Sequence, residues 1–75
     1  MEEIKGKFKA KNENGEKRKG KTFKSDFIRV INENKACYKN HTITYYLDGS
    51  ITAVFTGAYL MHNNFTATFK PKKNK

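Results

Sequence analysis

Residues 4–24 read IKGKFKAKNENGEKRKGKTFK, a basic stretch that decides how the chain starts to fold. In its first half every second residue is a lysine, from Lys5 to Lys11, and small or apolar residues such as Phe8 stand between them. Successive side chains of a strand point to opposite faces of a sheet. The alternation therefore predicts a half-buried strand with a lysine at every position of one face.

A hairpin turn is predicted after this strand at Asn14-Gly15, a pair typical of two-residue turns because both residues tolerate positive φ. The returning strand is predicted over residues 17–23, with Glu13 opposite Glu16. This register predicts that one side of the hairpin carries Lys5, Lys7, Lys9, Lys11, Arg18 and Lys24.

Such a cationic side is unfavourable for folding, because like charges opposite each other destabilise a strand pair. An anionic partner would relieve the repulsion. The alternative is that the lysines keep an edge hairpin from aggregating, which is a common use of charge on edge strands. Lys19 and Lys21 interrupt the apolar side, so the hairpin is expected to extend beyond the core or to stay mobile.

The centre of the chain begins with residues 26–32, which are rich in β-branched side chains and predict a central strand. The alternative is a short helix capped by Ser25 or Asp26. The inner face of that helix would consist of Phe27, Val30 and Ile31.

A second hairpin is predicted around Asp48-Gly49, between strands over residues 42–47 and 50–56. Pairing about a two-residue turn sets Ile43 beside Val54. Apolar side chains then occur on both faces of this hairpin, as expected for the middle of a sheet.

Together these segments predict an all-β fold, a small antiparallel meander of six or seven short strands with little or no helix. A curved sheet or a barrel of the size of oligonucleotide-binding or SH3-like barrels would protect its edges. In the last strand, Phe65, Ala67 and Phe69 are expected to share one face. We expect one domain over residues 1–70, made of a basic hairpin (1–24) and a near-neutral core (25–70), and a disordered basic tail over 71–75.

The net charge of +9 is concentrated at the two ends of the chain. Residues 1–24 carry nine Lys or Arg and four Glu, residues 25–70 carry four and three acids, and the last five residues add three lysines. This distribution indicates an electrostatic footprint for a polyanion. Lysine outnumbers arginine fourteen to two, which predicts contacts to a phosphate backbone with low sequence specificity, although an AT-rich genome also enriches lysine.

The sequence does not supply the residues that catalysis or metal binding needs. Cys37 and His41 are too far apart in extended structure to act as nucleophile and base, and one Cys with two His falls short of a zinc site. We therefore expect no enzyme activity, no cofactor and no metal. A single cysteine, with no signal-peptide core and no membrane span in the sequence, predicts a cytoplasmic protein without membrane attachment.

These observations lead to the hypothesis of a small basic module that binds DNA or RNA. Tyr45 and Tyr59 are candidate stacking platforms for bases. The candidate phosphate contacts are Lys5, Lys7, Lys9, Lys11, Arg18, Lys24, Lys72 and Lys73. The alternative is a phage- or plasmid-encoded accessory protein that binds and inhibits a host protein, through its basic face or an exposed strand edge. A chain this short would also gain stability as a homodimer.

Overall fold

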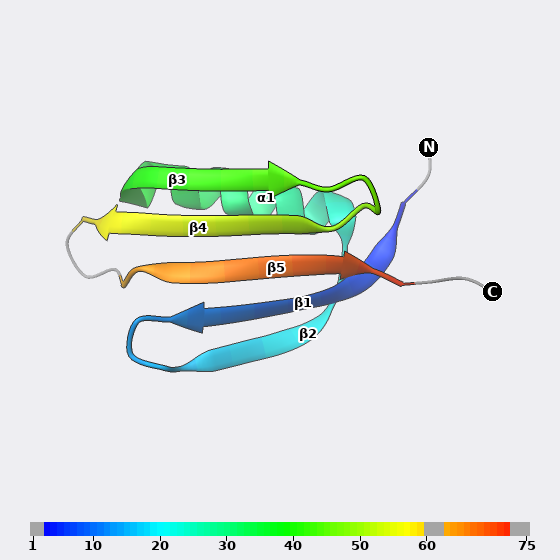
Figure 1. Ribbon diagram of the computed structural model, residues 1–75, viewed down its shortest axis with the longest axis horizontal. Helices are drawn as coiled ribbons and strands as arrows, with labels where there is room; N and C mark the ends of the chain where they lie inside the picture. The colour runs from blue at the N-terminus through cyan, green and yellow to red at the C-terminus, as the bar shows by residue number, and fades with distance from the viewer. Residues whose placement is uncertain (1–2, 60–62, 73–75) are drawn as a thin grey trace.

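The computed structural model describes residues 3–59 and 63–72, which form one antiparallel sheet with a helix on one of its faces (Figure 1). The elements in chain order are β1 (Lys5–Asn12), β2 (Lys17–Phe23), α1 (Lys24–Asn34), the 3-10 turn η1 (Lys35–Cys37), β3 (Tyr38–Tyr45), β4 (Ile51–Ala58) and β5 (Phe65–Pro71). The predicted small, mainly antiparallel β fold is confirmed. The described strands number five rather than six or seven, and they form an open sheet rather than a barrel.

The strand order of this sheet is β2-β1-β5-β4-β3. Two local units make it up, the β1–β2 hairpin and the β3–β4–β5 meander, and they join where β5 pairs with β1. The order is thus not a simple meander, because the last strand lies in the middle. The chain must cross from β2 at one edge to β3 at the other, and α1 makes this crossing behind the sheet (Figure 1).

The predicted strand over residues 26–32 is wrong, because these residues belong to α1. The helix buries Phe27 and Ile31, which lie four residues apart and so share a helix face, while Val30 remains 46% exposed. Neither Ser25 nor Asp26 caps it, since Phe23 occupies the N-cap without a side-chain hydrogen bond. Local β-propensity is overridden here because the crossing segment has to cover the apolar face of the sheet.

The core lies between α1 and the sheet. Its fully buried large side chains are Phe55, Phe69, Ile31 and Ile51. The rings of Phe27 and Phe69 lie 5.5 Å apart between centroids and connect the helix to the central strand β5. Phe65, Ala67 and Phe69 face this core together, as predicted.

Both hairpin turns contain three residues rather than the predicted two. In the first, the backbone N–H of Asn12 donates to the carbonyl of Glu16 at 3.0 Å, and Gly15 has a φ of 86°. In the second, the N–H of Tyr46 donates to the carbonyl of Ser50 at 2.9 Å, and Gly49 has a φ of 94°. A glycine in the left-handed region at the third position is typical of such loops.

The extra turn residue shifts each register by one position. Lys9 therefore lies opposite Lys19 in the first hairpin, and Ile43 lies opposite Ala53 rather than Val54 in the second. A shift of one residue moves every side chain of the returning strand to the other face of the sheet. This correction determines which cations share a surface.

Candidate functional site

The face of the sheet away from α1 carries an array of lysines, which we call the lysine face. The alternating strand β1 contributes four of them, and the corrected register adds three from β2 and one from β5. Its eight residues are Lys5, Lys7, Lys9, Lys11, Lys17, Lys19, Lys21 and Lys70. All eight are exposed.

The array is a grid rather than a line. Lys7 lies between Lys21 on β2 and Lys70 on β5, and Lys9 lies opposite Lys19. Neighbouring strands are about 4.8 Å apart, and alternate residues of one strand are about 6.7 Å apart. The grid therefore places several ammonium groups within reach of one ligand across as well as along the strands.

No carboxylate balances this face in the described part of the chain. Its acidic residues lie before β1, in the two hairpin turns and on α1: Glu3, Glu13, Glu16, Asp26, Glu33 and Asp48. The ion pair seen there joins Arg29 to Asp26 at 3.2 Å, and both residues belong to α1. Apart from that of Lys5, which lies 5.7 Å from the ring centroid of Phe23, the ammonium groups of the lysine face are thus left to water or to a bound anion.

Threonines continue the same face beyond the lysines. Thr66 and Thr68 on β5 lie opposite Lys11 and Lys9, and Thr52 on β4 follows beside Thr68. The other threonines of this face are Thr56 on β4 and Thr42 and Thr44 on β3. Their hydroxyls are neutral donors and acceptors that suit phosphate oxygens.

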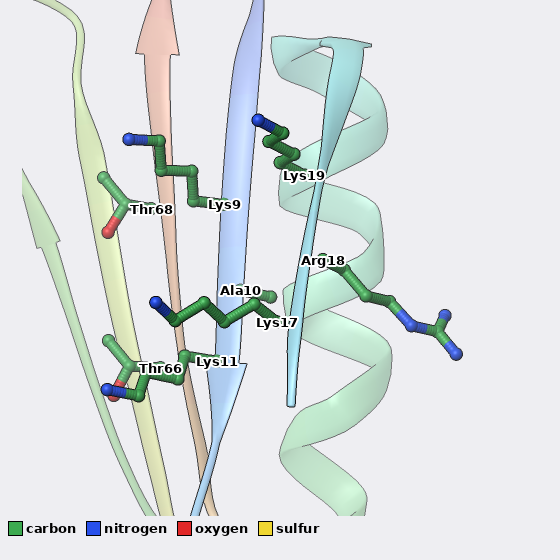
Figure 2. Close-up of a pocket in the computed structure, with 8 residues that line it drawn as sticks. All are labelled: Lys9, Ala10, Lys11, Lys17, Arg18, Lys19, Thr66 and Thr68. Carbon is green, nitrogen blue, oxygen red and sulfur yellow. The ribbon is translucent and has the colours of Figure 1, made fainter. Parts of the chain in front are cut away.

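A shallow hollow of about 540 Å³ lies where the lysines meet the threonines (Figure 2). Figure 2 shows Lys9, Lys11 and Lys17 extending over the same side as Thr66 and Thr68. Long cationic side chains on one flank and short hydroxyls on the other make a surface suited to an anionic ligand.

The structure brings together only part of the predicted cation set. Lys5, Lys7, Lys9 and Lys11 share the lysine face, as the alternation predicts. The prediction that Arg18 joins them is wrong, because Arg18 lies opposite Ala10 and extends to the other side of β2 (Figure 2).

The remaining predicted cations have different positions. Lys24 does not lie opposite Lys5 but begins α1, and its N–H donates to the carbonyl of Ile4 at 2.7 Å. Phe23 takes the position opposite Lys5, with its ring centroid 5.7 Å from the Lys5 Nζ. Lys72 is exposed beside Lys5, to whose carbonyl its N–H donates at 2.8 Å, and Lys73 lies outside the described residues.

Four lysines of the face were not predicted, namely Lys17, Lys19, Lys21 and Lys70. A three-residue turn places the first three correctly, and Asn12 is the signal for it. Its side-chain Oδ1 accepts the N–H groups of Asn14 and Glu16 at 2.9 and 3.0 Å, which closes the loop. Asparagine is well suited to this role because it hydrogen-bonds to the backbone two residues ahead.

The predicted stacking residues lie away from the lysine face. Tyr45 is 58% exposed and lies opposite Ile51, which places it on the helix side of the sheet. Tyr59 is 51% exposed and follows β4 at the other end of the same hairpin. The structure therefore does not bring these two rings together with the lysines.

Cys37 and His41 both lie next to residues of the hydrophobic core. Cys37 is half-buried against the core, and the ring centroid of His41 lies 6.4 Å from that of Phe55. Over residues 3–59 and 63–72, no three His, Cys, Asp or Glu side chains gather in a way that would hold a metal ion. Within the same residues, α1 is too short and too polar to cross a membrane.

Comparison with protein-family models, with curated proteins and with solved structures found no match. The functional argument therefore rests on the lysine face itself.

Proposed function

We propose that this protein binds nucleic acid through the lysine face and contacts the phosphate backbone with little sequence specificity. One observation carries the proposal: eight exposed lysines share an uncovered sheet face that has no acidic residue among the described strands. Phosphates would replace the missing carboxylates, and release of their counterions would drive binding.

Protection against aggregation accounts for only part of this array. Edge strands are the ones that need protective charge, and β2 is such an edge. However, β1 lies inside the sheet between β2 and β5, and β5 is the central strand. The lysines of β1 and Lys70 on β5 therefore serve no edge, and a ligand explains them better.

The residue types of the face favour backbone contacts. Lysine offers a flexible point charge to phosphate, whereas paired recognition of guanine uses the planar fork of arginine. Both arginines of the chain lie elsewhere, Arg18 on the other side of β2 and Arg29 on α1. Sequence readout is therefore expected to be weak.

The salt dependence of binding tests the proposal. If about six phosphates are neutralised on a DNA duplex, log affinity should fall against log salt with a slope of about −5. Fluorescence anisotropy of a labelled duplex at several salt concentrations measures this slope. Absence of binding even at low salt would refute the proposal.

Two neighbouring residues provide a matched pair of variants. Lys19 belongs to the lysine face, while Arg18 carries the same charge on the opposite side of β2. Lys19→Gln should make the slope shallower by about 0.9. Arg18→Gln should change it clearly less, and equal losses in the two variants would contradict the assignment of the site to this face.

A second candidate function is binding of a host protein, and the edge strand β3 favours it. Between residues 38 and 45 only Lys39 is formally charged, so this edge lacks the lysines that cover β2. An extended segment of an acidic protein would pair with such an edge by strand addition. Capture of a stoichiometric protein partner from lysate after nuclease treatment would support this function over the first.

A further inference from the structure

We infer that the nucleic acid bound by the lysine face is a duplex rather than a single strand. This inference rests on the proposed function and specifies its ligand. It follows from two properties of the face, the scarcity of aromatic rings and the two-dimensional arrangement of the charges.

The open face offers no platform on which successive bases would stack. On its strands, the one ring is that of Phe23, half-buried at the β2 edge with the Lys5 ammonium 5.7 Å from its centroid. Tyr46 continues the register of this face just beyond β3, at the opposite edge. Four strand spacings, or about 19 Å, separate these two edges.

The other aromatic side chains of the described strands and helix turn toward the helix side. Phe55 and Phe69 are fully buried there, and Phe8 and Phe65 pack against the same core. Proteins that bind single strands combine a cationic groove with exposed rings that stack on the bases. The lysine face has the cations without a row of neighbouring exposed rings.

The geometry of the charges suits a ligand with a dense phosphate array. The four lysines of β1 span about 20 Å along the strand, and Lys17, Lys19 and Lys21 form a parallel row one strand spacing away. A duplex carries one charge per about 1.7 Å of its axis, twice the linear density of one strand. Because this face offers dense positive charge and no row of exposed rings, the ligand with the denser phosphate array is favoured.

The threonines extend the contact surface without adding charge. From Lys9 the face continues sideways through Thr68 and Thr52 to Thr44. Threonine side chains are shorter than lysine side chains, and Thr66 and Thr68 line the hollow together with the lysines beside them (Figure 2). A wide ligand would rest its second phosphate row over these hydroxyls, which donate to phosphate oxygens.

A comparison of ligands of equal length tests the inference. The probes are a mixed-sequence DNA duplex, each of its two strands alone, and an RNA duplex of the same sequence. We expect either duplex to bind at least about tenfold more tightly than the single strands at moderate salt, with a steeper salt dependence, about −0.9 against −0.7 per phosphate.

The outcomes separate the inference from the proposed function. Equal or tighter binding of a single strand would overturn the inference and leave nucleic-acid binding intact. Failure of every probe to bind would refute both. As a second readout, Tyr46→Ala should leave duplex affinity unchanged. If the parent protein bound a single strand as tightly as a duplex, and Tyr46→Ala lost only the single-strand affinity, a stacking mode would be shown instead.

Discussion

Tyr38 links the first residue of β3 to the loop that precedes β5. Its side chain is 5% exposed and packs against Phe55 and Phe65, with ring centroids 5.3 and 5.6 Å away. The hydroxyl donates a hydrogen bond of 2.6 Å to the carbonyl of Asn63. Burial of the phenol, with smaller contributions from Cys37 and Glu13, raises its pKa above the ordinary 10.0.

This raised pKa predicts alkaline destabilisation that depends on Tyr38. The protonated phenol is favoured in the folded state, so its contribution is complete below pH 10 and is lost as the pH rises through the folded-state pKa. Tyr38→Phe should lower the free energy of unfolding by about 1 kcal/mol at neutral pH, because a hydrogen bond is lost. Above pH 10 the gap between the two proteins should narrow. Denaturant unfolding of both proteins across this pH range measures the difference in their free energies of unfolding. A difference that stays constant with pH would contradict the role of Tyr38.

At the scale of elements, β1 and β5 pack most closely at Gly6. Of the glycines in the fold, Gly6 is the one whose added Cβ would come nearest to a neighbouring atom. A Cβ placed on Gly6 would lie 2.2 Å from the carbonyl oxygen of Lys70 and 2.7 Å from Cζ of Phe69. The backbone oxygen belongs to the paired strand and has little freedom to move away. Gly6 is therefore required for β5 to enter the centre of the sheet.

Gly6→Ala should lower the free energy of unfolding by about 1–3 kcal/mol, as overpacking of a core usually does. Gly15→Ala is the control, since a Cβ there would meet open space and only the φ of 86° would be strained. Thermal unfolding of both variants should show the larger loss at Gly6. An equal or smaller loss at Gly6 would show that the two strands separate easily.

A comparison of the predicted with the observed strands and helix shows how far the sequence alone predicts this fold. The alternation in β1 and the two glycine turns identified both hairpins. The turn length was not readable from Asn14-Gly15, because Gly15 fits either loop and Asn12 decides between them through its side chain. The helix was predicted only as the alternative to a strand, because its composition favours a strand and the crossing between the two sheet edges is not visible in the local sequence.

The candidate site followed the same pattern of success and error. The lysines of β1 were predicted because they depend on strand periodicity, which is local. The lysines of β2 depend on register, so an error of one residue exchanged Arg18 for Lys17 and Lys19. Lys70 joins the face only because β5 pairs with β1, a long-range contact that no local pattern indicates.

At the scale of the whole molecule, repulsion between the lysines of the lysine face destabilises the folded state, while the same charges attract a polyanion. Lys9 lies opposite Lys19, so removal of the Lys9 charge relieves the repulsion between these two ammonium groups. We predict that Lys9→Thr raises the free energy of unfolding by about 0.2–1 kcal/mol without nucleic acid, and weakens nucleic-acid binding. Lys39→Thr is a control of the same charge change, because Lys39 on β3 has no lysine in the paired strand β4. Denaturant unfolding and anisotropy on the same samples measure both effects.

A loss of stability in Lys9→Thr, or a gain of equal size in Lys39→Thr, would show that repulsion on this face is negligible. Ligand addition provides the complementary observation. A ligand that binds only the folded state raises the free energy of unfolding in proportion to the logarithm of its concentration. The parent protein should therefore gain more from added duplex than Lys9→Thr does.

The most direct test of the account is a map of the contact surface by NMR. Titration of isotope-labelled protein with a short duplex should perturb amide signals of β1, β2 and β5, centred on Lys9, Lys19 and Thr68, and leave the exposed side of α1 around Arg29 and Glu33 unchanged. Perturbations centred on α1, or spread evenly around the molecule, would contradict the claim that the lysine face is the binding site.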